Sequence, residues 1–340
     1  MRHRGFTLVE AMAVVVVLLA LVAITAPVLG QPRRAARLQT SQDNLRFWGI
    51  AAGTYTMDYA GLMPAYSWRP GETYHVEGTG DVFINGTWQD AQNWQETNLL
   101  RRLTGRSTGP DKIRRSSNIY PHRRRTHLVM VDHMGLSPTD RRAADPQDRN
   151  QLVWQRDPLG FEEHGPWPEA TTGFEDQFGS FPVIQRWPYS SSYQVTIASF
   201  TLDRSGIAGL STIGPVAYSC NVFLTGTAPL GNRHDIEVAF PSGKVFMFEW
   251  HDRHSASQDL WYAYPQARPN RLMFDGSVQD RPSSEGGEGF DPRDPNDPEP
   301  FLYRYTPLTT DPQEVGDPEA LYPVGIRFTR DGLAGIDYTP

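Results

Sequence analysis

The sequence predicts an α+β protein in which one long N-terminal helix packs on a head that is largely an antiparallel β-sheet. Three observations lead to this prediction. Residues 11–30, AMAVVVVLLALVAITAPVLG, carry no charge, and an amphipathic helical pattern follows them. Glycine (30) and proline (28) are frequent among the 340 residues, which favours strands and loops over a helical bundle. Runs rich in Val, Ile, Phe and Tyr recur in the second half, bounded by glycine or proline.

Composition and charge exclude several classes of protein. Hydrophobic residues make up 39% of the chain and aromatic residues 11%, so the chain can bury a core and is not disordered as a whole. Residues 1–125 carry 16 Lys and Arg against 9 Asp and Glu, whereas residues 126–340 carry 16 against 30. Because the second half is acidic, we expect no nucleic-acid partner. The single cysteine, Cys220, excludes an intrachain disulfide and a Cys-rich zinc site.

The uncharged run 11–30 is long enough, as a helix, to cross about 30 Å of hydrocarbon. Arg2 and Arg4 precede it, so we expect the extreme N-terminus to stay cytoplasmic and the rest of the chain to face the other side. The run exceeds the roughly 7–15 apolar residues of an ordinary secretory signal, and Pro27 follows the nearest small-residue cleavage site. The alternatives are a cleaved secretory signal and a plain membrane anchor.

The residues in front of the apolar run indicate a third alternative. Residues 5–10 read GFTLVE and follow a short basic leader. This pattern resembles the processing site of type IV pilins and type II secretion pseudopilins. The resemblance implies that a prepilin peptidase cuts after Gly5 on the cytoplasmic side and that the new first residue, Phe6, is N-methylated. It also implies that the apolar segment is kept as an assembly helix.

Glu10 and Pro27 are the predicted assembly residues. A carboxylate at the edge of the hydrocarbon is costly unless it is paired. The resemblance implies that Glu10 pairs with the N-terminal amine of a neighbouring subunit and so sets the axial register of a filament. Pro27 removes a helix hydrogen bond, so we expect a kink or a locally melted turn there. Pilin-like proteins often carry a proline at this distance from the cut.

The helix is predicted to continue as an amphipathic segment that lies on the sheet. Gly61 and Pro64 are its expected end. The apolar positions that follow the helical spacing are Leu38, Leu45, Trp48, Ala52, Tyr55 and Tyr59.

The expected organisation has four parts. They are a prepilin leader at 1–5, a transmembrane assembly helix at 6–30, its amphipathic continuation at 31–64, and a periplasmic β-rich head at 65–340. Within the head we expect irregular chain at 65–125 and loop-rich insertions at 137–190 and 281–300. Asp275-Gly276 is expected to form a hairpin turn. The strand candidates are 126–132, 192–200, 216–224, 235–240, 244–250, 260–264, 271–274 and 324–328.

Two groups of side chains are candidate metal ligands. His251, Asp252 and His254 place two imidazoles and a carboxylate within one loop after a strand, although Arg253 opposes a cation there. A second group could supply carboxylate oxygens to Ca²⁺, as the resemblance to major pseudopilins suggests for the C-terminal region. Its members are Asp291, Asp294 and Asp297, with prolines interleaved between them. Hydrogen-bonding loop residues are the alternative for both groups.

The basic segment 101–125 holds nine cations and one anion, Asp111. It is either a patch for an acidic partner or a loop that balances the acidic remainder of the head. No nucleophile elbow, P-loop or zinc-protease pattern occurs in the sequence, so we expect no enzymatic activity.

The resemblance implies a structural function. The chain is expected to be a pilin-like or pseudopilin subunit of a type II secretion pseudopilus or a type IV pilus-like filament. Its expected partners are the prepilin peptidase, other pilin or pseudopilin subunits and the inner membrane. The head would lie in the periplasm or on an exported filament. The alternative is a membrane-tethered periplasmic module that binds a glycan or a protein and uses the leader only for delivery.

Overall fold

The computed structural model describes residues 7–116, 122–164, 181–215, 228–255, 259–304, 314–315, 321–323 and 325–339. Within the long N-terminal helix, residues 21–31 are described by their backbone alone. Gly5, Phe6, Cys220 and the predicted strand 216–224 lie outside the described residues.

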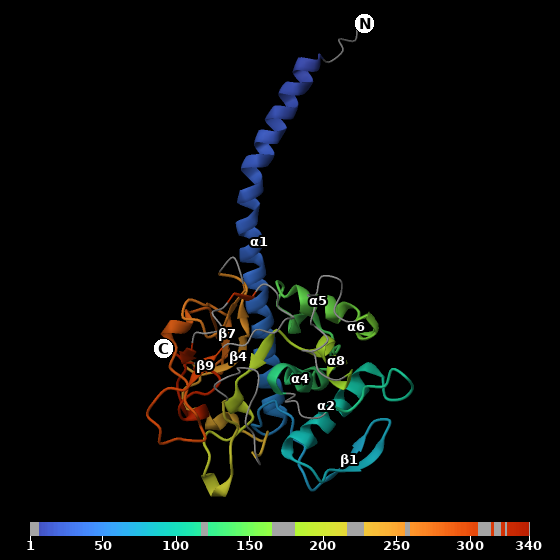
Figure 1. The fold of residues 1–340 in the computed structure, drawn as a ribbon, viewed down its shortest axis with the longest axis vertical. Coiled ribbons are helices and arrows are strands. Elements are labelled where there is room, and N and C mark those ends of the chain that lie inside the picture. The colour runs from blue at the N-terminus through green and yellow to red at the C-terminus, as the bar shows by residue number, and fades with distance from the viewer. Residues whose placement is uncertain are drawn as a thin grey trace.

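A single helix, α1 (Leu8–Asp58), projects from the head and then runs through it (Figure 1). It is continuous through Pro27, where the sequence predicts a kink or a melted turn. The helix ends before the predicted Gly61 and Pro64, because Ala60 and Gly61 adopt φ values of +54° and +87°. A backbone in this left-handed region cannot continue a right-handed helix.

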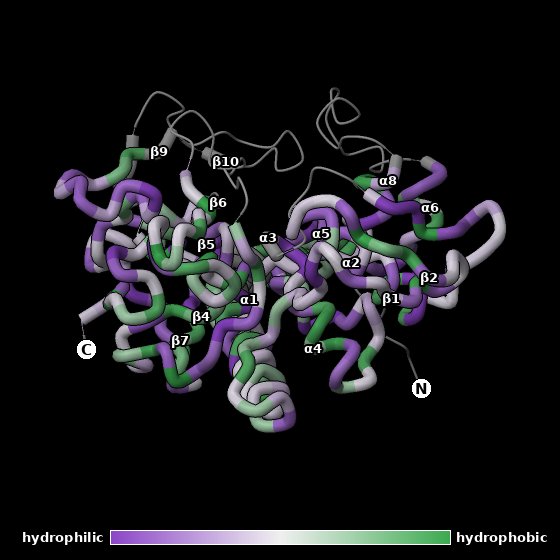
Figure 2. Tube along the Cα trace, turned by 90° about the horizontal axis from the view of Figure 1, so that it is seen from below, coloured by the Kyte–Doolittle hydropathy of each residue, from purple (hydrophilic) through white to green (hydrophobic). Residues whose placement is uncertain are grey.

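The head is divided by α1 into two lobes, which lie on opposite sides of the helix in both views (Figures 1 and 2). We call residues 65–190 the helical lobe and residues 193–339 the sheet lobe. The helical lobe contains the hairpin β1 (Thr73–Val76) and β2 (Gly80–Phe83), and the helices α2 (Trp88–Thr104), α3 (His122–Arg125), α4 (His127–His133), α5 (Arg149–Arg156), α6 (Pro158–His164) and α8 (Phe181–Ile184).

The sheet lobe is built on a four-stranded antiparallel sheet with the order β3-β4-β7-β8. Its strands are β3 (Tyr193–Val195), β4 (Val245–Glu249), β7 (Arg271–Met273) and β8 (Val278–Gln279). The predicted turn at Asp275-Gly276 joins β7 to β8, and Gly276 has the positive φ of +85° that such a turn requires. Smaller sheets use β5 (His251–Asp252), β6 (Asp259–Trp261), β9 (Leu302–Arg304), β10 (Glu314–Val315) and β11 (Leu321–Pro323).

The second half of α1 forms the centre of the core between the lobes. Leu45 and Trp48 have no exposed surface. They pack against Met130 and Val131 of α4 on one side and against β3, β4 and β7 on the other. Four members of the predicted apolar stripe are buried, namely Leu45, Trp48, Ala52 and Tyr55. Of the other two members, Leu38 is half-buried and Tyr59 is exposed.

The fold is mixed helix and sheet with antiparallel sheets, so the expectation of a largely β head is only partly correct. The strand predictions at 244–250 and 271–274 are confirmed by β4 and β7. Those at 192–200 and 260–264 hold for β3 and part of β6. The predictions at 126–132, 235–240 and 324–328 are wrong for the described residues, which form α4, a 3₁₀ turn and a turn-rich segment. Likewise, residues 65–125 contain a hairpin and a regular helix, α2.

The segment 126–132, which was predicted as a strand, shows why a helical periodicity could not be recognised in the sequence. It forms α4, and the five residues from His127 to Val131 are all buried. A helix buried on every side has no polar face, so its apolar run is the same as that of a buried strand. The alternation that distinguishes the two elements is therefore missing.

Candidate functional site

The first turn of α1 is organised by Thr7 and Glu10. The Thr7 hydroxyl accepts a hydrogen bond from the Glu10 backbone N–H (3.3 Å), and one Glu10 carboxylate oxygen accepts from the Thr7 backbone N–H (2.9 Å) and hydroxyl (2.8 Å). This reciprocal pair is a capping box, which satisfies two free N–H groups at the helix start. Glu10 was predicted as an assembly residue alone, although the T-x-x-E spacing at residues 7–10 is a capping-box signal.

The first part of α1 is an apolar rod that no other described segment of the chain covers. Every side chain from Leu8 to Ala20 is exposed. Leu8 is 79% exposed and Val16 is 63% exposed. Monomeric soluble proteins rarely expose a contiguous apolar surface of this kind, so the rod requires a partner surface. Over the residues described, no helix has the combination of length and apolarity that a membrane span requires.

The second part of α1 is tied to the head by polar contacts as well as by the core. The Trp48 indole N–H donates to the Arg142 carbonyl at 2.7 Å. The Ser41 hydroxyl bonds to Glu249 of β4 and lies 2.9 Å from the Tyr193 hydroxyl. Both lobes therefore contact the same helix.

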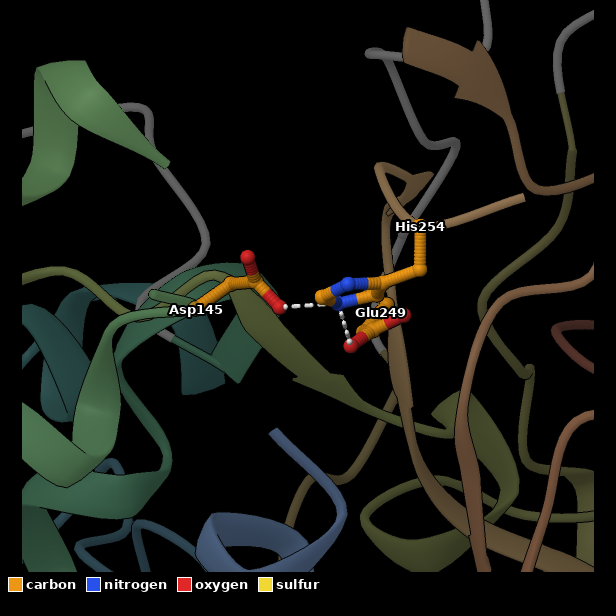
Figure 3. Close-up of side chains that lie close together, drawn as sticks. All are labelled: Asp145, Glu249 and His254. Carbon is orange, nitrogen blue, oxygen red and sulfur yellow. Dashed lines mark hydrogen bonds and ion pairs between the residues drawn. The ribbon is translucent and has the colours of Figure 1, made fainter. Parts of the chain in front are cut away.

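Next to Ser41 lies a buried group that we call the carboxylate–histidine cluster: Asp145, Glu249 and His254 (Figure 3). His254 Nε2 is 2.8 Å from Asp145 Oδ2 and 3.4 Å from Glu249 Oε1. The two carboxylate side chains have no exposed surface, and the His254 side chain is 2% exposed. The cluster joins the helical lobe, which provides Asp145, to the sheet lobe, which provides the other two residues.

The electrostatics of the cluster favour a charged imidazole. Burial opposes the charge on His254, but its hydrogen bonds to the Asp145 and Glu249 carboxylates outweigh burial and raise the pKa of His254 to about 10. Burial also opposes ionisation of Asp145, yet the hydrogen bond from His254 lowers the pKa of Asp145 to about 2. For Glu249 burial dominates, and the pKa of its carboxyl is raised.

Of the six predicted metal ligands, only His254 enters this cluster. Asp252 is engaged by the backbone N–H groups of His254 (3.0 Å), Ser255 (3.0 Å) and Arg268 (2.8 Å). The buried His251 lies with its Nδ1 3.2 Å from a guanidinium nitrogen of Arg253.

The three acidic candidates lie in a turn-rich loop of the sheet lobe. Asp291 forms an ion pair with Arg293, and a carboxylate oxygen of Asp297 accepts from the backbone N–H of Glu299 at 2.9 Å. In the part of the chain that the structure describes, no metal-ligating group includes Asp291, Asp294 or Asp297. Sequence reasoning missed Asp145, which is 109 positions from His254. It also missed Glu249, which was included in a predicted strand and not considered as a ligand.

The basic side chains of segment 101–125 largely have partners within the head. Arg106 pairs with Glu162 at 2.6 Å, Arg115 pairs with Asp90 at 2.6 Å, and Arg125 pairs with the buried Glu96. Arg101 is 3% exposed, and its guanidinium donates to the carbonyls of Ile113 and Glu77. The expected alternative, a balancing role in the head, therefore fits these cations better than a patch for an acidic partner.

The comparisons with known proteins concern the N-terminus. Residues 1–26 match the family model of the prokaryotic N-terminal methylation motif. No curated protein and no solved structure matches the chain. The motif is the prepilin-type signature that residues 5–10 indicated. It implies processing by a prepilin peptidase, assembly with pilin-like subunits in general, and membrane anchoring of an exported protein. The chain therefore carries a prepilin-type N-terminus ahead of a large head.

Proposed function

We propose that this chain is a structural subunit of a type II secretion pseudopilus or a type IV pilus-like filament. In this proposal the prepilin peptidase cuts after Gly5 and the new N-terminus, Phe6, is N-methylated. Residues 6–30 span the inner membrane once and later form part of the filament core. The head lies in the periplasm or on the outside of the filament.

One observation carries the proposal: the methylation motif at residues 1–26 includes the start of α1, and this helix is exposed and apolar at one end and buried in the head at the other. An exposed apolar rod is stable only when lipid or other apolar helices cover it. A filament core of bundled helices supplies that cover. The continuous helix would couple the position of the core segment to the position of the head.

We also propose that the role is structural and not catalytic. The carboxylate–histidine cluster, which contains His254, holds groups with strongly shifted pKa values. Perturbed groups of this kind mark catalytic sites when they line an accessible cleft. Asp145 and Glu249 have no exposed side-chain surface, so a substrate could not reach them without opening the α1 junction.

The first test is intact-mass and N-terminal peptide mass spectrometry of the protein from its own membranes. We expect a mature chain that begins with N-methyl-Phe6 and retains the apolar segment. A start beyond residue 23 would indicate ordinary secretion and would overturn the proposal. An uncut form beginning at Met1 would favour the membrane-tethered binding module.

The second test separates the two roles of Glu10, pairing between subunits and helix capping. Glu10→Gln removes the charge and keeps a side chain that can accept the Thr7 hydrogen bonds. The matched control, Thr7→Ala, removes the hydroxyl of the cap and keeps the carboxylate. If the carboxylate pairs with a neighbouring amine, Glu10→Gln abolishes incorporation into filaments and Thr7→Ala does not. Equal incorporation of Glu10→Gln and wild type would contradict an assembly role for the charge.

A further inference from the structure

The carboxylate–histidine cluster lies where three parts of the molecule meet. Asp145 follows the short turn Arg141–Ala143 of the helical lobe, Glu249 ends β4, and His254 follows β5 in the sheet lobe. Ser41 of α1 contacts Glu249 directly. Figure 3 shows that the His254 ring lies between the two carboxylates. Asp145 lies 109 positions from His254 in the sequence, and the fold brings it to the two residues of the sheet lobe.

We propose that Asp145, Glu249 and His254 bind one divalent ion of the zinc class, which acts as a structural joint between the two lobes and α1. The proposal concerns the head alone, so it is independent of whether the chain enters a filament.

The separations of the ligand atoms fit one small ion. An ion about 2.0–2.2 Å from each of several ligands holds neighbouring ligand atoms about 3.0–3.6 Å apart. His254 Nε2 lies 2.8 Å from Asp145 Oδ2 and 3.4 Å from Glu249 Oε1. All three ligand atoms lie within 4.8 Å of one another. Only small side-chain shifts are needed to place a zinc-sized ion between them.

The second shell around the cluster has the form that metal sites use to orient their ligands. The other ring nitrogen of His254, Nδ1, is 2.6 Å from the side-chain amide nitrogen of Gln147. A metal-bound histidine donates from this nitrogen, so binding of an ion through Nε2 requires the Gln147 amide to turn its oxygen toward the ring. The backbone N–H of Gln147 donates to Asp145 Oδ1 at 2.6 Å, so Oδ2 is left to face the ring. The Asn270 backbone N–H donates to Glu249 Oε2 at 2.8 Å, and Oε1 is the oxygen nearest His254.

The surrounding charges favour an additional cation. Asp148 and Asp259 lie 3.1 and 3.2 Å from the guanidinium of Arg253, which balances them in part. Asp145 and Glu249 both face the imidazole of His254. A divalent ion would neutralise the two buried carboxylates while His254 is neutral.

The ligand set selects the class of ion. Calcium takes six to eight oxygen ligands, and a site with one imidazole and two carboxylates does not suit it. An imidazole nitrogen with two carboxylate oxygens suits zinc and similar first-row ions. Because the site is buried, the ion would enter during folding and would copurify with the protein.

The test is the metal content of the full-length chain, purified in detergent without an affinity tag after growth in medium supplemented with zinc. We expect about one equivalent of zinc per chain by plasma mass spectrometry, as a structural site requires. Growth with cobalt should give protein with the visible absorption of protein-bound Co²⁺. Wild-type protein with less than about a tenth of an equivalent of any divalent ion, and without cobalt absorption, would show an ion pair only.

Two sets of variants locate the ion. His254→Gln and Glu249→Gln should reduce the bound zinc to background, whereas two control variants should keep it. Asp337→Asn breaks another buried ion pair, with Lys244, and controls for general destabilisation. His75→Ala removes the exposed His75–Asp81 pair (2.9 Å), which is the obvious adventitious ligand. Zinc that disappears in His75→Ala but remains in His254→Gln would overturn the proposal. If the two ligand variants do not fold, the wild-type metal content alone decides.

Discussion

The two lobes that flank α1 differ in how their buried charged groups are paired. In the helical lobe, one carboxylate, Glu96, is placed between two guanidiniums, those of Arg125 and Arg186. In the sheet lobe, the carboxylate–histidine cluster places one imidazole between two carboxylates. The group around Glu96 has one positive charge in excess, whereas the carboxylate–histidine cluster has one positive charge too few. The two buried groups, which lie on opposite sides of α1, therefore have net charges of opposite sign.

Two of the buried histidines, His254 and His127, show the same contrast. His254 faces two carboxylates, and its pKa is raised to about 10. His127 of α4 packs edge-on against Trp48, and neither of its ring nitrogens makes a hydrogen bond of good geometry with the residues described. Burial, with a smaller contribution from Arg125, lowers the pKa of His127 to about 3. The environment, and not the residue type, therefore decides which histidine is charged.

The largest effect is expected where both lobes depend on the same side chain. Trp48 has no exposed surface, packs between α4 and the sheet, and donates its indole N–H to Arg142. Trp48→Ala should lower the free energy of unfolding by about 3–5 kcal/mol, measured by urea unfolding of the full chain in detergent. The control Ile50→Ala alters a side chain that is 67% exposed and should cause no comparable loss. A similar loss in both variants would contradict the central position of Trp48.

Next in size is the loss of the buried carboxylate of the helical lobe. Glu96→Gln leaves the guanidiniums of Arg125 and Arg186 buried without their counter-ion, which should cost about 3–5 kcal/mol of unfolding free energy. Asp132→Asn is the matched control, because it breaks the partly exposed pair with Arg102 and should change stability little. If Glu96→Gln and Asp132→Asn unfold at the same urea concentration, the ion pairs of Glu96 with the two buried guanidiniums are not a major contributor to stability.

The sheet lobe was more predictable from the sequence than the helical lobe. The strands β4 and β7 and the turn at Gly276 follow from local signals, namely β-branched and aromatic runs and an Asp-Gly pair. In the helical lobe, α2 also had a local signal, because Thr87 and Asp90 form a capping box at its start, but that signal was not used. α4 had none, because its apolar run is buried on all sides.

The candidate sites also differ in how far they could be predicted from the sequence. The prepilin-type motif is contiguous in sequence and could be identified from residues 5–10 alone. The carboxylate–histidine cluster depends on Asp145 and His254, which the fold brings together across 109 positions. Nothing in the local sequence of Asp145 marks it as a ligand. Short-range patterns predict contiguous signals, whereas long-range clusters depend on lobe packing that no local pattern encodes.

A pH-dependent effect is expected from His127, and its sign follows from the two pKa values. In the unfolded chain a histidine titrates near 6.5, whereas the pKa of His127 in the folded chain is about 3. Between these values the unfolded state binds more protons, so stability falls as the pH is lowered, by up to about 1.4 kcal/mol per pH unit. The contribution is fully present above pH 6.5 and is lost toward pH 3.

The measurement for His127 is urea unfolding of wild type and of His127→Leu at several values between pH 7 and pH 4. The difference between the two curves isolates His127 from the carboxylates that titrate in the same range. The stability of wild type relative to the variant should decrease with decreasing pH. A difference that is independent of pH would mean that Asp140, which faces the ring and favours its charge, cancels the effect of burial.

The smallest effect concerns two glycines of α1 that lie one turn apart. A side-chain carbon at Gly53 would meet no atom within 4 Å, whereas one at Gly49 would lie 3.1 Å from Leu272 Cδ1 of β7. Gly53→Ala should raise the free energy of unfolding by about 0.5–1 kcal/mol, because alanine loses less entropy than glycine on entering a helix. Gly49→Ala has the same entropic gain but must push against the sheet, so its net effect should be smaller. An equal gain at both positions in urea unfolding would show that the contact between α1 and β7 is loose, and that the helix is held mainly by Trp48 and its neighbours.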